Sequence, residues 1–335
     1  MTTLAELGEH EVLRRLRRFC AATVGDDAAL LRLEATQQLV VSTDVLVEAV
    51  HFSDRTLSPQ DLGWRAAAVN LSDLAAMGAS PLGITVGASL PGSTSWAWLE
   101  AVYSGLQSCL ERYGGAILGG DLTSGAHRCL SITVLGSVAA GQALYRHRAQ
   151  VGQQLVATGV HGAAQAGLAL LLGEISTERP EAKGWRMAHQ RPRPRFDAVS
   201  TLRSLYPRGR ITDPVAAMDT SDGLADAVIQ ICQQSGVGAR LLRSQLPVPP
   251  GLAAAVGQPQ AEQWTLYGGE DFELVMGLPA AVAAVFCQQQ PGSCIVGQIQ
   301  AGHAVELADD LEGGPSLALD QNRGYRHFAA GAAGP

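Results

Sequence analysis

The chain has 335 residues, of which 47% are hydrophobic and 16% are charged, and its formal net charge is −7. It can therefore build large cores and is long enough for two domains, but it lacks the basic surface of a nucleic-acid-binding protein, so we expect no nucleic-acid partner. Its single lysine, Lys183, stands in PEAKGWR, which excludes a Walker A phosphate loop.

The first part of the chain alternates between helical and strand patterns. Apolar residues at helical spacing predict a helix over residues 4–19, and the run LVVST predicts a strand over Leu39–Thr43 that ends at Asp44. A cap serine followed by a proline predicts a helix that begins at Ser58 and ends at Gly78. Further expected elements are a strand in PLGITVGASLP, a helix over 95–113, and strands in AILGGDLTSG and LSITVLGSVAAG.

The second part of the chain continues this alternation. A strand in QQLVATGVHG and a helix in AAQAGLALLL precede the segment Arg179–Arg195, whose prolines and clustered cations predict an exposed surface segment. Further expected elements are the strand, turn and helix of AAMDTSDGLADAVIQICQQSG and strands in ARLLRSQLP, YGGEDFELVMGLP and CIVGQIQ. The pattern predicts an α/β or α+β protein with two domains, residues 1–140 and 141–335.

The sequence contains no pattern that predicts export or membrane insertion. The N-terminal residues form an amphipathic pattern without the apolar core of a signal peptide. Prolines interrupt the uncharged window Leu74–Leu99, and glycines, glutamines and a histidine interrupt Ala149–Gly173, so we expect no membrane partner. The 6 cysteines form no C-x-x-C pair. We therefore expect a reduced, cytoplasmic protein.

Several acidic residues stand at the predicted ends of elements rather than on exposed helix faces. They are Asp26, Asp27, Asp44, Asp73, Asp121, Asp219, Asp222, Glu270 and Asp271. A single Asp beside a glycine is most often a turn former or a helix cap, and that interpretation stays open for each one. As a group they favour a ligand site, because Asp44 and Asp121 each follow a predicted strand, and strand ends carry the ligand sites of α/β proteins.

Oxygen-bearing side chains accompany these acids. Asp73 lies inside a predicted helix, an unfavourable place for aspartate, and it needs a partner if it is buried. Many acids with few counter-charges favour hard divalent cations such as Mg²⁺, and Ser42–Asp44 and Ser221-Asp222 supply ligands of that kind. The glycine pairs of Gly119–Asp121 and Gly268–Asp271 would let the backbone approach a ligand closely. A negatively charged protein would then bind a nucleotide through Mg²⁺.

Six motifs follow one another along the chain: GDDAAL, STDVLVEAVHF, NLSDLAAMGASP, GGDLTSG, DTSDGLAD and GGEDFEL. In this order they closely resemble the thiamine-monophosphate kinase family, within the aminoimidazole-ribonucleotide-synthetase-like superfamily, and the resemblance covers about Val24 to Phe328. The resemblance implies a two-domain α/β fold whose N-terminal domain binds ATP and metal and forms a shared barrel in a homodimer, with a C-terminal domain that completes the active site. It also implies ATP-dependent phosphorylation of thiamine monophosphate to thiamine diphosphate, with several Mg²⁺ ions.

The same resemblance implies a role for each residue that matches a motif. The expected metal ligands are Asp27, Ser42, Thr43, Asp44, Asp73, Asp121, Asp219 and Asp222. The expected ATP contacts are Tyr113, Gly120, Asp121, Arg146 and Ser221, and the expected contacts to thiamine monophosphate are His51, Glu270 and Tyr325. Three positions beside the ATP region depart from the family pattern, because Arg148 replaces a glycine, Gln153 replaces an aspartate and Leu122, in GGDLT, replaces a threonine.

The implied chemistry needs no covalent catalytic residue. The acceptor is a phosphate monoester whose second pKa is about 6, so it is largely ionised at neutral pH and needs no general base. The sequence shows no Ser-His or Cys-His pair, and we expect direct in-line transfer assisted by metal ions. In DTSDGLAD, Ser221 is also expected to cap the following helix, and Asp226 to interact with the helix dipole.

Two alternatives stay open. The chain could be another ATP-dependent enzyme of the same superfamily, although Cys20 and the C-terminal sequence match those members poorly. It could also be a non-catalytic ATP- or metal-binding dimer whose acidic residues serve stability.

Overall fold

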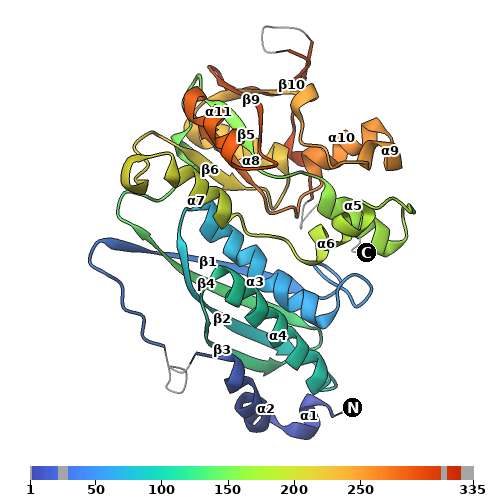
Figure 1. Cartoon of the computed structure of the whole chain (residues 1–335). Coiled ribbons are helices and arrows are strands. Elements are labelled where there is room, and N and C mark those ends of the chain that lie inside the picture. The colour runs from blue at the N-terminus through green and yellow to red at the C-terminus, as the bar shows by residue number, and fades with distance from the viewer. Residues whose placement is uncertain (1, 22–28, 311–314, 326–335) are drawn as a thin grey trace. The chain divides into compact units, whose positions relative to one another are not determined.

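The computed structural model describes residues 2–21, 29–310 and 315–325, which fold into two compact units (Figure 1). The N-terminal unit contains residues up to Leu74 together with Ala79–Gly141, and the C-terminal unit contains Ala75–Gly78 and the described chain from Gln142 to Tyr325. Each unit combines helices with its own sheet, which confirms the predicted mixed α/β class. Among the described residues, none of the helices has the length and apolarity that a membrane span requires.

The N-terminal unit is a 4-stranded sheet whose strand order is β1-β4-β2-β3, so that β1 and β3 are its edges. The strands are β1 (Gln37–Val47), β2 (Ser80–Leu90), β3 (Ile117–Ser124) and β4 (Cys129–Ala139). The helices are α1 (Leu4–Leu7), α2 (Glu9–Leu16), α3 (Pro59–Ala76) and α4 (Trp96–Tyr113). The helix predicted over residues 4–19 is therefore interrupted, because Gly8 adopts a left-handed backbone with φ 74° between α1 and α2.

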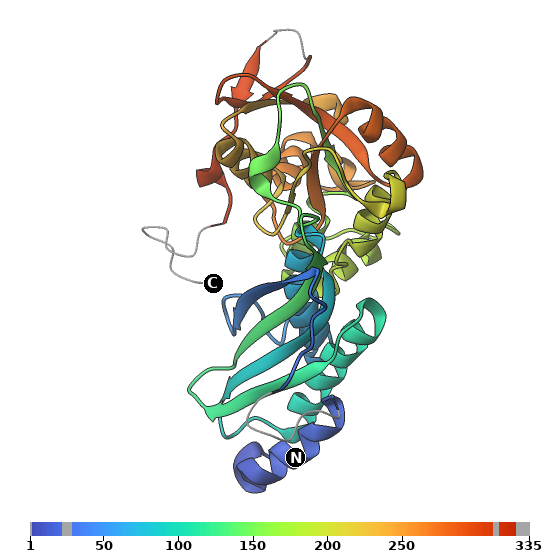
Figure 2. The same cartoon turned by 90° about the vertical axis from the view of Figure 1, so that its left-hand side faces the viewer.

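Helices α3 and α4 lie side by side along one face of this sheet (Figures 1 and 2). Their backbones touch at two glycines: an added β-carbon at Gly63 would lie 1.9 Å from the Val102 oxygen, and one at Gly105 would lie 2.0 Å from the Gln60 oxygen. Such contacts leave no room for a side chain, so α3 has one position against its neighbour. Asp73, which is the predicted metal ligand on α3, is therefore held on a rigid element.

The strands correct the predicted place of two acidic residues, because β1 continues beyond Thr43 and β3 runs without a break from Ile117 to Ser124. Asp44 lies inside β1, where it pairs with Ile132 of β4, and Asp121 lies inside β3, where it pairs with Gly87 of β2. The prediction that these residues follow strand ends is wrong, because a backbone ladder continues through an aspartate whenever the neighbouring strand offers its hydrogen-bonding groups.

The C-terminal unit is built on a 7-stranded sheet with the order β11-β10-β7-β9-β5-β8-β6. Its strands are β5 (Gln154–Ala157), β6 (Ala216–Asp219), β7 (Gly238–Leu242), β8 (Leu274–Leu278), β9 (Cys294–Gln300), β10 (Val305–Ala308) and β11 (Ser316–Ala318). Its helices are α5 (Ala163–Leu172), α6 (Ala182–Gln190), α7 (Phe196–Ser204), α8 (Leu224–Ser235), α9 (Leu252–Val256), α10 (Gln258–Tyr267) and α11 (Ala280–Gln289).

Apolar residues on both faces of this sheet explain its continuous apolar strands. Leu155 and Ala157 of β5 face a core formed with α8, whereas Val156 faces a second core formed with α7 and α11. A third, smaller core joins α5, α6, α9 and α10. A sheet covered on both faces gives nearly continuous apolar runs, such as residues 215–218 and Leu274–Leu278 in this unit.

The segment Arg179–Arg195 corrects a second prediction. It was expected to lie on the surface, but its helix α6 buries Trp185 and His189, and Arg195 is only 8% exposed. The cations misled the prediction because Arg195 is paired with acidic residues inside the unit rather than solvated.

Candidate active site

The first group of predicted site residues lies where β1 meets α3. The Ser42 hydroxyl donates a hydrogen bond of 2.5 Å to Oδ2 of Asp73, and the Asp44 backbone N–H donates one of 3.1 Å to Oδ1 of Asn70. Asn70 is fully buried, and its side chain donates in turn to the Ala66 carbonyl. The structure therefore brings Ser42, Asp44 and Asp73 to one face of the sheet.

Thr43 and His51 are placed differently from this group. The Thr43 hydroxyl lies 2.9 Å from that of Thr133, on the opposite face of the sheet from Ser42, so Thr43 could reach a metal beside Asp73 only with its backbone. His51 stands in the turn after β1, where its Nδ1 accepts a hydrogen bond of 3.0 Å from the Val47 N–H. That bond places any ring proton of a neutral His51 on Nε2.

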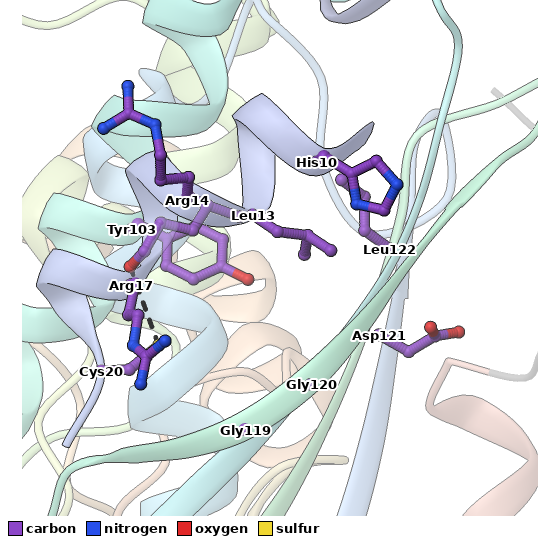
Figure 3. Close-up of a pocket in the computed structure, with 11 residues that line it drawn as sticks. His10, Leu13, Arg14, Arg17, Cys20, Tyr103, Gly119, Gly120, Asp121 and Leu122 are labelled. Atoms are coloured by element: carbon purple, nitrogen blue, oxygen red, sulfur yellow. Dashed lines mark hydrogen bonds between the residues drawn. The ribbon is translucent and has the colours of Figure 1, made fainter. Parts of the chain in front are cut away.

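Gly120 and Asp121 lie on the edge strand β3. They line a pocket of about 370 Å³ that is formed with α2 and α4, beside Arg14 and Arg17 (Figure 3). Figure 3 shows the Asp121 carboxylate directed away from α2. Tyr113, the last residue of α4, is not among the pocket residues and packs edge-on against Trp64 with ring centroids 6.1 Å apart.

Asp121 does not share a face with Asp44 and Asp73. The pairing of β2 with β3 shifts at Leu118, so that Ile117 pairs with Ile84 on the face covered by the helices, whereas Asp121 pairs with Gly87 on the opposite face. Such a shift reverses the alternation of side chains along a strand. Within one N-terminal unit, Asp121 is thus on the open face and on the edge strand opposite β1.

The predicted ligand Asp27 lies outside the described residues.

The second group of predicted site residues surrounds the turn between β6 and α8. Asp219 ends β6 and is 3% exposed, and the Ser221 hydroxyl lies 3.4 Å from its Oδ1. The helix α8 begins after Gly223, whose φ is 108°, and no side chain caps it. The prediction that Ser221 caps this helix is therefore wrong. The glycine backbone makes the entry to the helix, which leaves the Ser221 side chain beside Asp219.

The loop between α10 and β8 lies directly against this turn. The Glu270 N–H donates a hydrogen bond of 2.7 Å to the Ser221 carbonyl, and the Thr220 N–H donates one of 2.9 Å to the Glu273 carbonyl. Glu270 and Phe272 both adopt left-handed backbone, with φ 62° and 51°, which is uncommon outside glycine. These bonds join a predicted substrate contact, Glu270, to the turn that carries the predicted metal ligands.

The Asp271 side chain joins this loop to the N-terminus of α5. Its two carboxylate oxygens accept hydrogen bonds of 2.6 Å and 2.8 Å from the N–H groups of Gly162 and Ala164, at the N-terminus of α5. Burial raises the pKa of Asp271 to about 7, against the effect of these two donors. The side chain thus caps a helix that has no other side-chain cap.

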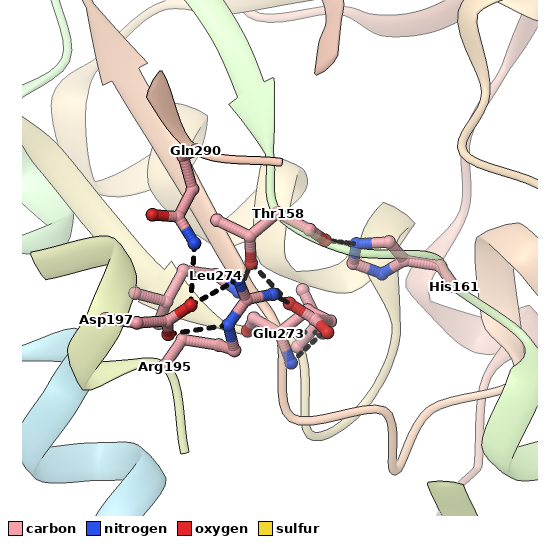
Figure 4. Close-up of polar contacts among 8 residues, drawn as sticks. Thr158, His161, Arg195, Asp197, Glu273, Leu274 and Gln290 are labelled. Atoms are coloured by element: carbon pink, nitrogen blue, oxygen red, sulfur yellow. Dashed lines mark hydrogen bonds and ion pairs between the residues drawn. The ribbon is translucent and has the colours of Figure 1, made fainter. Parts of the chain in front are cut away.

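A buried ionic network continues from the same loop (Figure 4). Arg195 contacts the Glu273 carboxylate and donates two hydrogen bonds of 2.9 Å to Asp197, while Thr158 donates one of 2.5 Å to Glu273. Burial opposes the charge of Arg195, but its contacts with Asp197 and Glu273 outweigh that effect and raise its pKa. The network fixes the start of β8.

The remaining predicted residues lie along α8 and near the end of the described chain. Arg146 donates a hydrogen bond of 2.7 Å to Gln230, about two helical turns from Asp222. Tyr325 is 61% exposed, and the preceding residue, Gly324, lies against Asp222, since an added β-carbon would be 3.5 Å from the backbone carbonyl oxygen of Asp222. The structure thus brings Tyr325 to the acidic turn and leaves Arg146 to one side of it.

Two of the departures from the family pattern, Arg148 and Gln153, have structural partners. The Arg148 guanidinium stacks over the Tyr145 ring at 4.6 Å. Gln153 is 5% exposed. Its amide nitrogen donates a hydrogen bond of 2.6 Å to the Pro214 carbonyl, and its amide oxygen accepts one of 2.9 Å from the Gln150 N–H. A neutral amide satisfies both partners, one a donor and one an acceptor, which a carboxylate would not.

The predicted ligands are carboxylates and hydroxyls, and Mg²⁺ binds oxygen ligands of this type. In the described part of the chain no three His, Cys, Asp or Glu side chains are close enough together to hold a metal on their own. Mg²⁺ nevertheless uses one or two carboxylates and completes its shell with waters and substrate phosphates. Asp44 and Asp73 with Ser42, and Asp219 and Asp222, are sets of that size.

Sequence reasoning missed several residues that shape these groups. They are Asn70, Glu273, Arg195 and His189. Asn70 stood in NLSD and Glu273 in GGEDFEL, so their motifs contained the signal, but the partners of each side chain depend on elements distant in the sequence. His189 gave no signal, because the segment around it was predicted to be exposed.

Comparisons with known proteins agree over nearly the whole chain. A family model described as AIR synthase related protein, N-terminal domain, matches residues 25–138. A thiamine-monophosphate kinase from Synechococcus elongatus is 46% identical over 330 residues, covering 97% of this chain and 98% of the relative. The crystal structure of thiamine-monophosphate kinase from Stenotrophomonas maltophilia matches with a TM-score of 0.78 at 34% identity, covering 89% of this chain and 96% of that one.

A further solved structure is described as AaThiL complexed with AMPPCP and TMP. It matches with a TM-score of 0.73 at 27% identity, and the match covers 95% of this chain and 99% of that one. The order of the six motifs, the mixed α/β fold and an identity of 46% over almost the full length of a curated relative lead to one conclusion. The chain belongs to the thiamine-monophosphate kinase family of enzymes.

Proposed function

We propose that the chain transfers the γ-phosphoryl group of ATP to the phosphate of thiamine monophosphate, giving ADP and thiamine diphosphate. Family membership supports this reaction, and so does the ligand pair of the related AaThiL structure, an ATP analogue together with TMP. The observation that carries the proposal is the hydrogen bond between Glu270 and Ser221. It joins the residue expected to contact the acceptor to the turn expected to hold metal and ATP.

We propose that Asp44, Asp73, Asp219 and Asp222 hold Mg²⁺ ions, with Ser42 beside Asp73. When bound, Mg²⁺ would neutralise the phosphates of both substrates, whose mutual repulsion opposes the reaction. The chain's own side chains bind and orient. Ser42 fixes the Asp73 carboxylate by donating to it, and Asn70 fixes the β1 backbone at Asp44.

We propose in-line transfer without a phosphorylated enzyme. The acceptor phosphate is already largely ionised at neutral pH, since its second pKa is about 6, so no side chain has to remove a proton from it. His51, with Nδ1 occupied by the Val47 N–H, offers its Nε2 to a phosphate or a ring of the substrate. Glu270, His51 and Tyr325 are accordingly proposed to bind thiamine monophosphate, and Tyr113, Gly120, Arg146 and Ser221 to bind ATP.

We also propose that the chain forms a homodimer through the open face of the N-terminal sheet. Three apolar residues of β1, Leu39, Val41 and Val45, are 47%, 55% and 46% exposed on this face. A row of exposed apolar residues on an edge strand favours association with another protein surface. Asp121 lies on the same face, so a second copy packed there would place it at the interface. Because ATP is the donor, we place the reaction in the cytoplasm.

Phosphoryl transfer is tested by incubating purified protein with ATP and Mg²⁺, with and without thiamine monophosphate, and measuring both ADP and thiamine diphosphate. We expect thiamine diphosphate from thiamine monophosphate and none from thiamine. A folded protein that binds ATP but forms no thiamine diphosphate would contradict the proposal and favour another ATP-dependent reaction. Retention of configuration at phosphorus would contradict direct in-line transfer.

A further inference from the structure

Helix α6 brings a buried histidine to the proposed substrate residue Glu270. The Nδ1 atom of His189 lies 3.5 Å from Oε2 of Glu270, which is within ion-pair distance. The two side chains are exposed very differently, since that of His189 is 2% exposed and that of Glu270 is 35% exposed. His189 therefore lies behind the carboxylate, while the carboxylate itself remains accessible to a ligand.

The position of His189 is fixed by the packing of α6 on α5. An added β-carbon at Gly167 of α5 would lie 2.0 Å from the Trp185 carbonyl, so the two helices touch through their backbones. Trp185 and Ala182, on the same side of α6 as His189, are buried in the core formed with α5, α9 and α10. An imidazole on such a helix has little freedom to move relative to its neighbours.

The backbone of Glu270 is fixed independently, through Asp271. The Asp271 carboxylate is bound to the N-terminus of the same helix α5, and Glu270 donates from its own N–H to Ser221. These contacts determine where the Glu270 backbone lies, and none of them is made to its carboxylate. The contact with His189, in contrast, is made to the carboxylate itself.

We propose that His189 is a positioning residue that orients the Glu270 carboxylate toward thiamine monophosphate. The inference rests on the proposed function of this site. The thiazolium ring of thiamine is cationic, so an anionic side chain can bind it. A carboxylate that is already oriented loses less conformational freedom when it binds such a group. Helix α6 thus contributes to acceptor recognition without contacting the acceptor.

The test compares three substitutions of His189. In His189→Leu the contact with Glu270 is lost; His189→Asn places an amide nitrogen near the position of Nδ1, and His189→Gln places one near the position of Nε2. We expect His189→Leu to raise KM for thiamine monophosphate about fivefold while KM for ATP is unchanged, the scale of one partly exposed charged contact. His189→Asn should recover more of the wild-type KM than His189→Gln, whereas a purely structural role would not separate the two.

Two controls separate this role from a general loss of structure. The matched substitution His303→Leu, in an exposed turn of the same unit, should leave both KM values unchanged. In a Glu270→Gln background, His189→Leu should add no further increase in KM, because its partner is already neutral.

The outcomes distinguish this inference from the proposed function. A wild-type protein that forms no thiamine diphosphate would contradict the proposed function, and the inference with it. Normal wild-type turnover together with an unchanged KM in His189→Leu would overturn the inference alone. An equal rise in KM for ATP would also overturn the inference. So would a fivefold rise in KM for thiamine monophosphate when His189→Leu is added to Glu270→Gln.

Discussion

The acidic residues of the two units are held by different means. In the N-terminal unit, Asp44 and Asp73 stand on a regular strand and helix, and Ser42 and Asn70 hold them through side-chain hydrogen bonds. In the C-terminal unit, Asp219 and Glu270 stand at turns with left-handed residues, and backbone bonds and a buried ionic network hold the loop. The first arrangement lets an acid be changed without changing the fold, whereas the second ties the position of the acid to the stability of the unit.

The largest effect is expected from the ionic network. Arg195→Leu leaves Glu273 buried without its cation, so we expect the free energy of unfolding to fall by about 3–5 kcal/mol, measured by urea denaturation. The matched control is Arg193→Leu, an exposed arginine of the same segment, for which we expect a change within about 0.5 kcal/mol. If Arg195→Leu does not fold, Glu273→Gln tests the same pair. Equal, small losses in the two arginine variants would show that the network does not stabilise the loop.

A second large effect concerns pH. Burial lowers the pKa of His161 to about 4, with a further contribution from Arg195, against the hydrogen bond to Thr158. Because an unfolded histidine takes up a proton near pH 6.5 and the folded one does not until about pH 4, the free energy of unfolding should fall by about 3 kcal/mol across that range. Above pH 6.5 this contribution is constant.

The histidine contribution is isolated with His161→Gln, whose amide can still donate to the Thr158 carbonyl. Urea denaturation at pH 7 and at pH 4 should show a smaller loss of stability on acidification in the variant than in the wild-type protein. Parallel losses in both proteins would mean that other groups, and not His161, cause the dependence on pH. This experiment probes the C-terminal unit, where the buried network lies, and so sharpens the contrast with the N-terminal acids.

The N-terminal acids should affect activity rather than stability. Asp73→Asn keeps an oxygen that accepts the Ser42 hydrogen bond but removes the charge, so we expect kcat/KM to fall about 100-fold with an unchanged melting temperature. Glu111→Gln, an exposed position on α4, is the control and should change neither quantity. A large drop in melting temperature for Asp73→Asn would remove the distinction between the two units.

The limits of the sequence follow from the same contrast. Helix α4 was predicted within one residue, because Ser95 caps it and Gly114 closes it, and both signals are local. The face on which Asp121 lies was not predictable, since it depends on the shift of pairing at Leu118, and both Ile117 and Leu118 are apolar and buried. The left-handed backbone at Glu270 and Phe272 was equally hidden, because neither residue type favours it and only the contacts of Asp271 and Ser221 explain it.

The smallest expected difference separates two neighbouring hydroxyls on β1. Ser42→Ala removes the hydrogen bond to Asp73, so we expect kcat/KM to fall about tenfold, the scale of one bond to a charged group. Thr43→Val removes a hydroxyl that faces Thr133 on the other side of the sheet, and we expect a change of less than about twofold, within the ordinary effect of a surface substitution.

Steady-state kinetics on the two variants decides whether Thr43 acts through its side chain. If Thr43→Val is as harmful as Ser42→Ala, the metal contact expected of Thr43 must lie on the open face, with Asp121, and not beside Asp73. The face of the sheet that carries the chemistry would then be shared between Thr43 and Asp121, and the open face would have to belong to the active site as well as to the proposed dimer interface. If only Ser42→Ala is harmful, the site beside β1 is confined to the face that α3 covers, and any contribution of Thr43 comes from its backbone.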